Sequence, residues 1–474
     1  MPPRRSKVRW IGAGVAGLLV VGGVAVAARG PSGPDHPDEW DPRVLPLAEF
    51  VEQARGLEFE HPVHVDFLDE DEWAAWGEVD SSDLSDEEVE VLEQTPAVFR
   101  ALGMAEGDFD LLAAVQDVQT DGTVGFYEFA TERISVRGLE MTWQVKATLV
   151  HELTHVLQDQ HFDIGDRLQI EGRGLTDETA LHVVAEGDAD RIEGLWADQL
   201  PDADRAALEA EMAEGVAGAE ADLAHVPGSV VALFGSTYVL GAGFVAVVEA
   251  DDGQDGIDHA FELPPGPEEH VFDPLSYLQL DEPEDVDLPD VDGEVLDGFD
   301  GPFGVVGWYL MLAERTDPAT ALVTLEGWGG DASRAFVRDG RTCIALRYRG
   351  EDEAAAVGLE AVATAWAAAM PIEADAVVGR DGDVVEVTSC DPGADAEVIE
   401  GDGRSVDLIG LPAIRAGLAA EVLAGGGDPV QARCFASGFV GQIPYELLVS
   451  ETTTPEQDDH IELVSASMVE TCLL

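Results

Sequence analysis

The sequence predicts an α+β protein: a mainly helical domain with a small antiparallel sheet, then a smaller α+β region that contains disulfides. Three observations predict this class. Segments with apolar residues three and four positions apart, as in helices, dominate residues 142–224. Alternating runs at 61–68 and 124–138 indicate strands, the second with a hairpin turn. Hydrophobic residues make up 46% of the 474 residues, enough for sizeable cores.

The elements follow in order from local signals. Helix start and stop signals and amphipathic spacing predict helices over 46–56, 82–104, 142–160, 176–200 and 203–224. Beyond an acidic stretch punctuated by proline and glycine, apolar and alanine-rich runs predict helices at 303–315 and 352–370. Asp381 and Gly382 between two alternating runs predict a second hairpin.

Composition shifts divide the chain into four parts. Residues 1–33 form an N-terminal signal segment and spacer, and 34–280 form the main, mostly helical domain. Residues 281–302 are an acidic linker or surface loop, and 303–474 form the C-terminal α+β region.

The charge balance is strongly acidic. The chain has 25 basic and 96 acidic residues, a formal net charge of −71. Such a surface repels phosphate backbones and anionic lipid, so nucleic-acid binding and a polybasic membrane patch are excluded. The acidity is typical of a solvated, halophilic surface whose self-repulsion is screened by salt.

The N-terminus has the opposite charge and predicts export. Arg4, Arg5, Lys7 and Arg9 precede the uncharged stretch 11–28, which reaches the lower limit of a membrane span. The length favours an uncleaved anchor, with cleavage near Ala27 and secretion as the alternative. Either way, the rest of the chain is predicted to be extracytoplasmic, with contact to the membrane through this segment only.

The cysteines agree with export. The chain has four cysteines, an even number, and no two of them form a CxxC pair: Cys343, Cys390, Cys434 and Cys472. Disulfides are therefore expected. Three connectivities are open, of which the sequential pairing is preferred.

The pattern HELTH within the helix predicted at 142–160 carries chemistry. His151 and His155 are one turn apart, so both imidazoles project from one face and can share a metal ion. Glu152 points to the neighbouring side, where it can reach a water molecule at the metal. The alternative is that the histidines belong to a purely structural helix.

The next helix carries a second set of polar residues. His182, Glu186 and Asp190 lie four apart on one stripe of a helix that is apolar on more than one side. Three ionisable groups in line on a core helix are costly unless a cation satisfies them. Glu186 is the predicted third, carboxylate ligand, and Asp190 can hold a ligating histidine through its second nitrogen. The alternative is that the stripe faces water.

These residues carry a family resemblance. HELTH, followed by the E-x-x-x-D pattern of Glu186 and Asp190, resembles the gluzincins, zinc metallopeptidases with two His ligands and one Glu. HELTHVLQDQHFD at 151–163 with AEGDA at 185–189 resembles more closely a group of exported bacterial gluzincin-like proteins. GFYEFATERISVRG ahead of the site and GWGGD at 327–331 are similar too. The latter also predicts a turn with glycines at positive φ. The interval from His155 to Glu186 is longer than in thermolysin-like members, so the resemblance does not extend to the loop between them.

The resemblance implies one Zn²⁺ per chain, held by His151, His155 and Glu186 with a fourth position for water. It implies that Glu152 is the general base that takes a proton from this water and passes it to the leaving amine. The expected substrate is a peptide or protein.

A metallopeptidase also needs an electrophile for the oxyanion. Tyr238, in an apolar, glycine-rich stretch at 233–245, is the predicted catalytic partner; an ordinary core tyrosine is the alternative. His270, Tyr277 and His182 are further candidates, and His182 is also expected beside the ligands.

The resulting hypothesis is an extracytoplasmic zinc-dependent peptidase. The alternative is a non-catalytic metallopeptidase-like module for binding or envelope assembly, with a structural metal or none. An intact Glu152 favours the enzyme, since a structural metal site needs no base.

Overall fold

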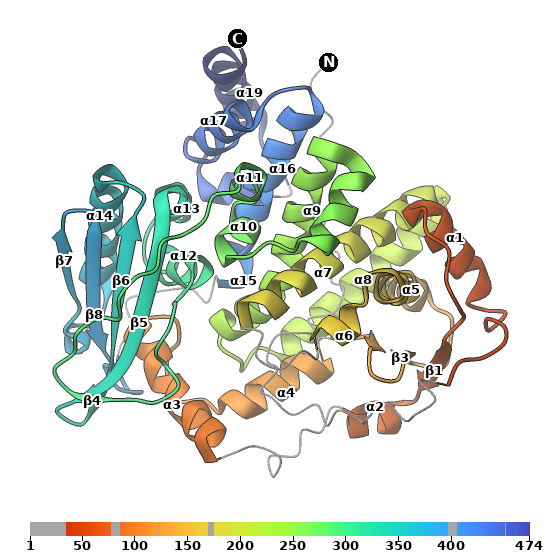
Figure 1. Cartoon of the computed structure of the whole chain (residues 1–474), viewed down its shortest axis with the longest axis horizontal. Coiled ribbons are helices and arrows are strands. Elements are labelled where there is room, and N and C mark those ends of the chain that lie inside the picture. Colours follow the sequence, from red (N-terminus) through yellow and green to blue (C-terminus); the bar gives the residue numbers. More distant parts are fainter. Residues whose placement is uncertain (1–34, 77–85, 122, 169–174, 397–404, 451) are drawn as a thin grey trace.

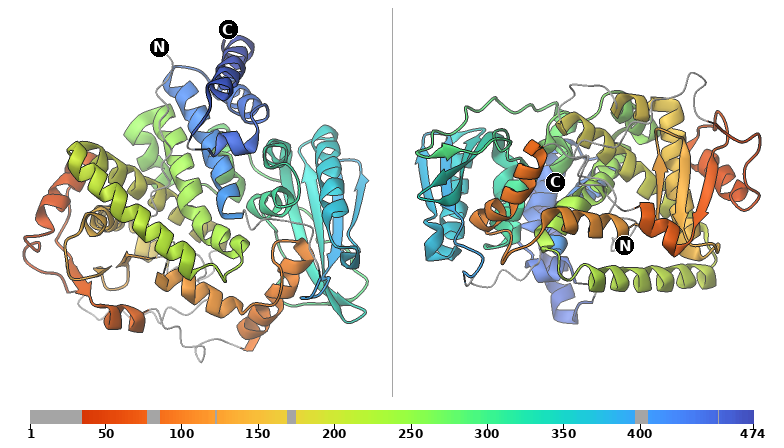
Figure 2. Two further views of the ribbon diagram at one scale, coloured as in Figure 1. Left: turned by 180° about the vertical axis from the view of Figure 1, so that it is seen from behind. Right: turned by 90° about the horizontal axis from the view of Figure 1, so that it is seen from below.

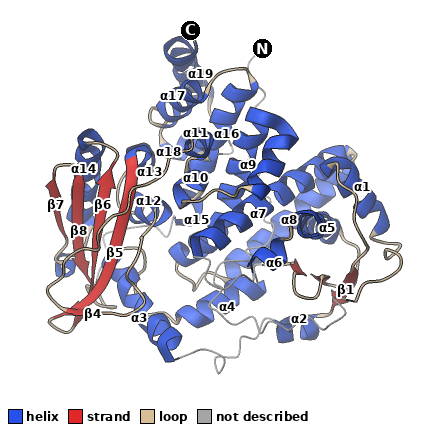
Figure 3. Ribbon diagram, in the orientation of Figure 1, coloured by secondary structure: helices blue, strands red, loops and turns tan. Residues whose placement is uncertain are grey.

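The computed structural model describes residues 35–76, 86–121, 123–168, 175–396, 405–450 and 452–474. The predicted anchor at 11–28 and its cleavage site lie outside these residues. The chain forms a central helical body with a three-stranded sheet on one side and a five-stranded sheet on the other (Figures 1 and 3). The predicted α+β class is confirmed.

The helical body contains most of the first 280 residues. Its helices are α1 (Leu45–Arg55), α2 (Glu70–Trp76), α4 (Leu111–Asp121), α5 (Trp143–Phe162), α6 (Ile164–Leu168), α7 (Leu175–Gln199), α8 (Asp202–Asp222), α9 (Gly228–Glu262), α10 (Glu268–Phe272) and α11 (Pro274–Gln279). Helices α5, α7 and α9 pack in series through its centre, while α8 runs along the outside (Figure 2). Accordingly, α5 is buried over most of its length, whereas α8 buries only Leu208 and Met212.

The three-stranded sheet has the order β1-β3-β2, with β1 at His64–Leu68, β2 at Gly125–Glu128 and β3 at Arg133–Arg137. The hairpin predicted at 124–138 is the antiparallel β2–β3 pair. Strand β1 joins β3 in parallel, so this sheet is mixed where an antiparallel sheet was expected. Strand β2 is left at the edge of the sheet, next to α5.

The five-stranded sheet is antiparallel throughout, with the order β4-β5-β6-β8-β7. Its strands are β4 (Glu294–Val295), β5 (Trp328–Arg338), β6 (Arg341–Gly350), β7 (Val377–Asp381) and β8 (Val384–Cys390). Helices α3 (Asp86–Leu102), α12 (Val305–Ala313), α13 (Pro318–Thr324) and α14 (Glu353–Ala369) share the largest hydrophobic core with one face of this sheet. The predicted hairpin around Asp381 and Gly382 is the β7–β8 pair.

The acidic segment 281–302 lies along this sheet. Its Val291 packs against a small apolar cluster around Phe336, and its Glu294 and Val295 form β4. From the first half of the chain, α3 also reaches the sheet, where Arg100 forms an ion pair of 2.7 Å with Asp391. The two halves are therefore joined by packing as well as by the acidic segment.

The C-terminal part is helical and carries one of the two disulfides. Its helices are α15 (Ser405–Leu408), α16 (Gly410–Ala424), α17 (Pro429–Val440), α18 (Tyr445–Leu448) and α19 (Pro455–Met468), and a π-helical turn η4 (Val469–Leu473) follows. Cys434 in α17 bonds to Cys472 in η4, and Cys343 in β6 bonds to Cys390 in β8. The sequential disulfide pairing is confirmed.

Helix α9 is the longest helix, and the sequence patterns did not predict it. It is long and apolar enough to cross a membrane by length and composition, but 56% of its most apolar stretch is buried inside the protein. It packs between α7 and α16, as the core helix of a folded domain does. A kink at Asp252 and Gly253 bends its second half.

The motif GWGGD was interpreted as a turn, and this prediction is wrong. Trp328 begins β5, and the strand runs through Asp331 with an irregularity in register between these two residues. Of the glycines in the motif, Gly330 has a positive φ, of 134°. Glycine is needed there because a side chain would meet the backbone oxygen of Glu284 at 2.4 Å.

Candidate metal centre

Helix α5 presents the HELTH residues inside the protein. The side chain of Thr142 caps its N-terminus by accepting a hydrogen bond from the amide of Val145. Just over two turns later, His151, Glu152 and His155 are 4%, 6% and 7% exposed. Polar groups this deep in a core require partners.

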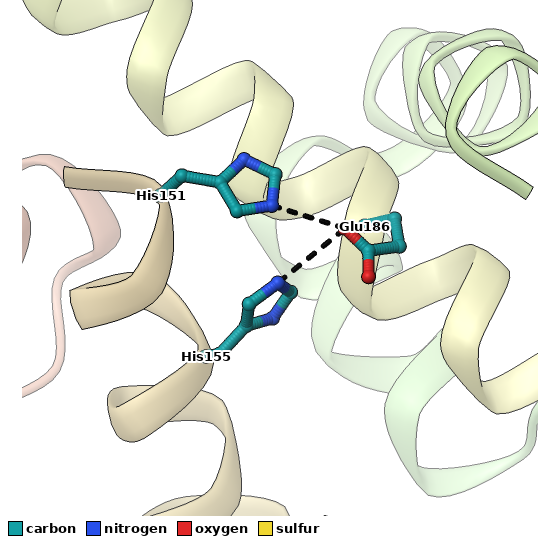
Figure 4. Close-up of side chains that lie close together, drawn as sticks. All are labelled: His151, His155 and Glu186. Carbon is teal, nitrogen blue, oxygen red and sulfur yellow. Dashed lines mark hydrogen bonds and ion pairs between the residues drawn. The ribbon is translucent and has the colours of Figure 1, made fainter. Parts of the chain in front are cut away.

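The main partner is Glu186 of α7, as predicted. His151 Nε2 lies 3.0 Å and His155 Nε2 lies 3.4 Å from the same oxygen, Oε2 of Glu186. Figure 4 shows both imidazoles on α5 pointing across to this carboxylate on α7. The three residues form a buried group that could hold a metal ion.

The spacing of these donor atoms suits a small tetrahedral ion. A metal with bonds of about 2.0–2.1 Å to nitrogen and oxygen holds neighbouring ligand atoms roughly 3.3–3.4 Å apart. The two His–Glu186 distances, 3.0 and 3.4 Å, are close to this value. The donor set of two imidazoles and one carboxylate therefore fits a metal ion.

In the metal-free chain, these groups stabilise one another as ions. Burial alone would lower the pKa of His151, but its hydrogen bonds with Asp190, Glu186 and Glu193 outweigh burial and raise this pKa well above its ordinary value. Burial would raise the pKa of Glu186, but the charge of His155 and the hydrogen bond from His151 lower it to about 2. A protonated histidine thus occupies the electrostatic role that a cation would take.

The second nitrogen of His151 faces carboxylates. Its Nδ1 lies 3.4 Å from Asp190 Oδ1 and 3.5 Å from Glu193 Oε2, both on α7. Acceptors on this side favour the tautomer in which Nδ1 carries the hydrogen and Nε2 offers its lone pair towards Glu186. The sequence analysis predicted Asp190 as the partner of a ligating histidine, whereas Glu193 was not predicted.

The second nitrogen of His155 is held by an amide. Its Nδ1 lies 3.0 Å from Oε1 of Gln158, whose Nε2 donates to the carbonyl of Ala185 and to Asp188. Because both of those partners can only accept, the amide orientation of Gln158 is fixed. Its oxygen must then accept from His155 Nδ1–H, which leaves the Nε2 lone pair of His155 free to bind a metal.

Behind Gln158 lies a buried ion pair. Asp188 accepts a hydrogen bond of 2.7 Å from Arg55 of α1, and both side chains are 0% exposed. Arg55 also pairs with Asp258 of α9, and Arg191 pairs with Asp188 from the same helix. These contacts connect α1, α7 and α9 directly behind His155.

Glu152 lies beside the ligands and is not one of them. Burial raises its pKa, although the charges of His155 and His151 and a hydrogen bond from the backbone amide of Tyr127 oppose this. This amide belongs to β2, an edge strand of its sheet, so β2 faces Glu152. A carboxyl group with a raised pKa is a stronger proton acceptor than an exposed one.

Helices α7 and α9 touch at glycines next to Glu186. A methyl group on Gly187 would lie 2.1 Å from the carbonyl oxygen of Gly241, and one on Gly241 would lie 2.5 Å from the carbonyl oxygen of Val183. This close approach positions the turn of α9 that carries Tyr238, three residues before Gly241. The rings of Tyr238 and His151 are 6.4 Å apart, so the structure brings this predicted residue to the site.

The other candidate electrophiles lie outside the group formed by His151, His155 and Glu186. Tyr277 packs on Phe244 and donates to the carbonyl of Leu263, and His270 hydrogen-bonds the carbonyl of Asp281. Neither contacts the ligands in the part of the chain that the structure describes. His182 lies one turn before Glu186 on α7, half-buried and outside the ligand group.

Sequence reasoning did not identify the residues behind the histidines. Gln158 and Glu193 carried a local signal, because each lies three residues beyond a predicted site residue on its helix. Asp188 stands inside the AEGDA motif but received no role. Arg55 had no signal, because its partner Asp188 is 133 residues away.

Among known proteins, no family model, no curated protein and no solved structure matches this chain.

Proposed function

We propose that this chain is a zinc-dependent peptidase. The observation that carries the proposal is the convergence of His151, His155 and Glu186, with both Nε2 atoms 3.0–3.4 Å from one oxygen of Glu186 and with Glu152 buried beside them. Two imidazoles and a carboxylate are ligands typical of catalytic zinc, which keeps one position open. A purely structural zinc site more often has four protein ligands.

When bound, zinc supplies a Lewis acid that makes water acidic near neutral pH and polarises a carbonyl group. Glu152 accepts the proton of the attacking water and delivers it to the leaving amine. Asp190 and Gln158 hold the Nδ1 hydrogens of His151 and His155, which orients both rings so that their Nε2 atoms would face the metal ion. Tyr238, whose ring lies 6.4 Å from that of His151, would donate its hydroxyl hydrogen to the developing oxyanion.

The position of β2 at the edge of its sheet supports a peptide as the substrate. The amide of Tyr127 already donates towards Glu152 from this edge. An extended peptide that pairs with β2 would bring a backbone carbonyl to the water and the base. The predicted N-terminal segment and the two disulfides support an extracytoplasmic location for this activity.

One observation favours the alternative, a non-catalytic module with a structural metal. The site is closely packed, with His151, His155 and Glu186 between 4% and 9% exposed. A peptide must reach the metal, whereas a structural ion needs no access. Glu152 separates the two functions, because only catalysis uses a base there.

The test measures zinc by mass spectrometry together with cleavage of a complex peptide mixture. Wild type is compared with Glu152→Gln and Glu186→Ala, and Glu214→Gln and Glu214→Ala on the exposed face of α8 are the matched controls. We expect one zinc per chain and chelator-sensitive cleavage in wild type and both controls. Glu152→Gln should keep zinc and lose cleavage, and Glu186→Ala should lose both.

Other outcomes decide between the functions. Zinc without cleavage in the wild type would support the structural module. Cleavage that survives Glu152→Gln would refute the proposed base, and an absence of zinc from the wild type would refute the metal centre.

A further inference from the structure

Three carboxylates outside the candidate metal centre meet at one point. They are Glu269 in α10, Asp281 just after α11 and Glu351 just after β6, and one oxygen of each lies within 4.8 Å of the others. Two of these segments belong to the helical body, and the third leaves the five-stranded sheet (Figure 1). The cluster therefore lies where the two parts of the molecule meet.

Glu269 is the residue that distinguishes this cluster from an ordinary acidic surface. It is only 5% exposed, and its carboxyl group has no hydrogen-bond or ion-pair partner among the described residues. Arg433, whose charge also acts on Glu269, forms its ion pair with Asp273. Burial and the charges of Asp281, Asp273 and Glu351 outweigh the opposing charge of Arg433 and raise the pKa of Glu269 to about 8.

The backbone holds the other two carboxylates at the cluster. His270, which is 3% exposed, donates its Nε2 hydrogen to the carbonyl oxygen of Asp281. The amide of Glu351 donates to the carbonyl of Gly327, 3.0 Å away. Two exposed carboxylates are thus held against a buried one, although like charges at this distance repel one another.

We propose that Glu269, Asp281 and Glu351 bind a calcium ion that joins the helical body to the five-stranded sheet. An all-carboxylate set selects hard cations over zinc. Calcium binds oxygen at about 2.3–2.6 Å, so opposite ligands are up to roughly 5 Å apart, which the spacing of this cluster satisfies. Magnesium also binds oxygen, at about 2.0–2.1 Å, but it usually keeps several waters and is seldom held by protein ligands alone. Because Asp281 and Glu351 are exposed, water can fill the remaining coordination positions.

The experiment is calorimetric titration of CaCl₂ into the chelator-treated full-length protein at about 1 M NaCl, which screens the net charge of −71. Wild type is compared with Glu351→Gln. The matched control is Glu282→Gln, an exposed glutamate beside Asp281 and outside the cluster. Glu186→Ala reports separately on the candidate metal centre, and MgCl₂ is the competing probe.

We expect one saturable calcium per chain and a higher melting temperature on binding. Affinity should fall at least tenfold in Glu351→Gln and stay within twofold of wild type in Glu282→Gln and Glu186→Ala. An absence of saturable binding would overturn the proposal. Equal losses of calcium affinity in Glu351→Gln and Glu282→Gln would also overturn the proposal, since they would indicate that calcium is attracted by the overall negative charge and not bound at this cluster. Loss of the calcium site in Glu186→Ala would assign the ion to the other centre.

Discussion

Replacing Gly187 by alanine tests whether contact between helix backbones positions the metal ligand Glu186. In the middle of an ordinary helix, alanine is more stable than glycine by about 0.8–1 kcal/mol. At Gly187 the added methyl group would lie 2.1 Å from the carbonyl oxygen of Gly241 and 2.8 Å from the side chain of Val245. Since a backbone atom cannot give way as a flexible side chain can, α9 must move away from α7.

Gly194, two turns along the same helix, provides the control. A methyl group there would meet nothing within 4 Å. Gly194→Ala should therefore raise stability by up to about 1 kcal/mol. Overpacking typically costs about 1–3 kcal/mol, so Gly187→Ala should lower stability by that amount in spite of its better helix propensity.

The assay is thermal unfolding followed by circular dichroism, with zinc content measured on the same samples. Gly187→Ala should melt several degrees below wild type and bind metal more weakly, because the separation of α9 from α7 disturbs the turn of α7 that carries Glu186. Gly194→Ala should melt at or above the wild-type temperature with unchanged metal content. Equal stability gains in both variants would refute the close helix contact.

Three further predictions concern the site, pH and salt. Gln158→Leu should weaken metal affinity about 10–100-fold in a chelator competition, because His155 Nδ1 loses its acceptor; unchanged affinity would contradict the role of Gln158. Burial and the charge of Asp331 raise the pKa of Glu268 from 4.5 to about 8. The folded state therefore holds a proton that the unfolded state releases, and stability falls as pH rises through this interval. The melting temperature of Glu268→Gln should therefore rise relative to that of wild type as the pH is raised from 5 to 8. A difference in melting temperature that stays constant over this range would refute this interpretation. Because a net charge of −71 repels itself, the melting temperature should rise from about 0.1 M to about 2 M NaCl, whereas a flat or falling profile would contradict a halophilic surface.

The candidate ligands were predictable because each signal is local. The spacing from His151 to His155 and from His182 through Glu186 to Asp190 needs only the period of a helix. The packing of α5 against α7 was inferred from chemistry, because the polar stripe on an otherwise apolar helix needs a polar partner. The structure supplies the partner, with both Nε2 atoms directed at one oxygen of Glu186.

The residues that hold the histidines were less predictable because they depend on packing between distant segments. The ion pair between Arg55 and Asp188 forms only when α1 docks on α7. Helix α9 escaped detection because residues 228–248 contain no charged residue and are rich in glycine, a composition that conceals a helical period. Its glycines reflect close helix contacts, as at Gly241, which no local pattern reveals.

The charges around the site connect metal binding to protons. Four carboxyl groups surround His151 and His155: Glu152, Glu186, Asp190 and Glu193. Burial raises the pKa of Asp190 to about 6 and also raises that of Glu152. The hydrogen bonds of His151 with Asp190, Glu186 and Glu193 raise the pKa of His151, so protons compete with a metal ion for this site. A divalent ion would replace those protons, because it binds the histidines only in their neutral form. Metal affinity should therefore strengthen as pH rises, since the protons released on binding are then held less tightly.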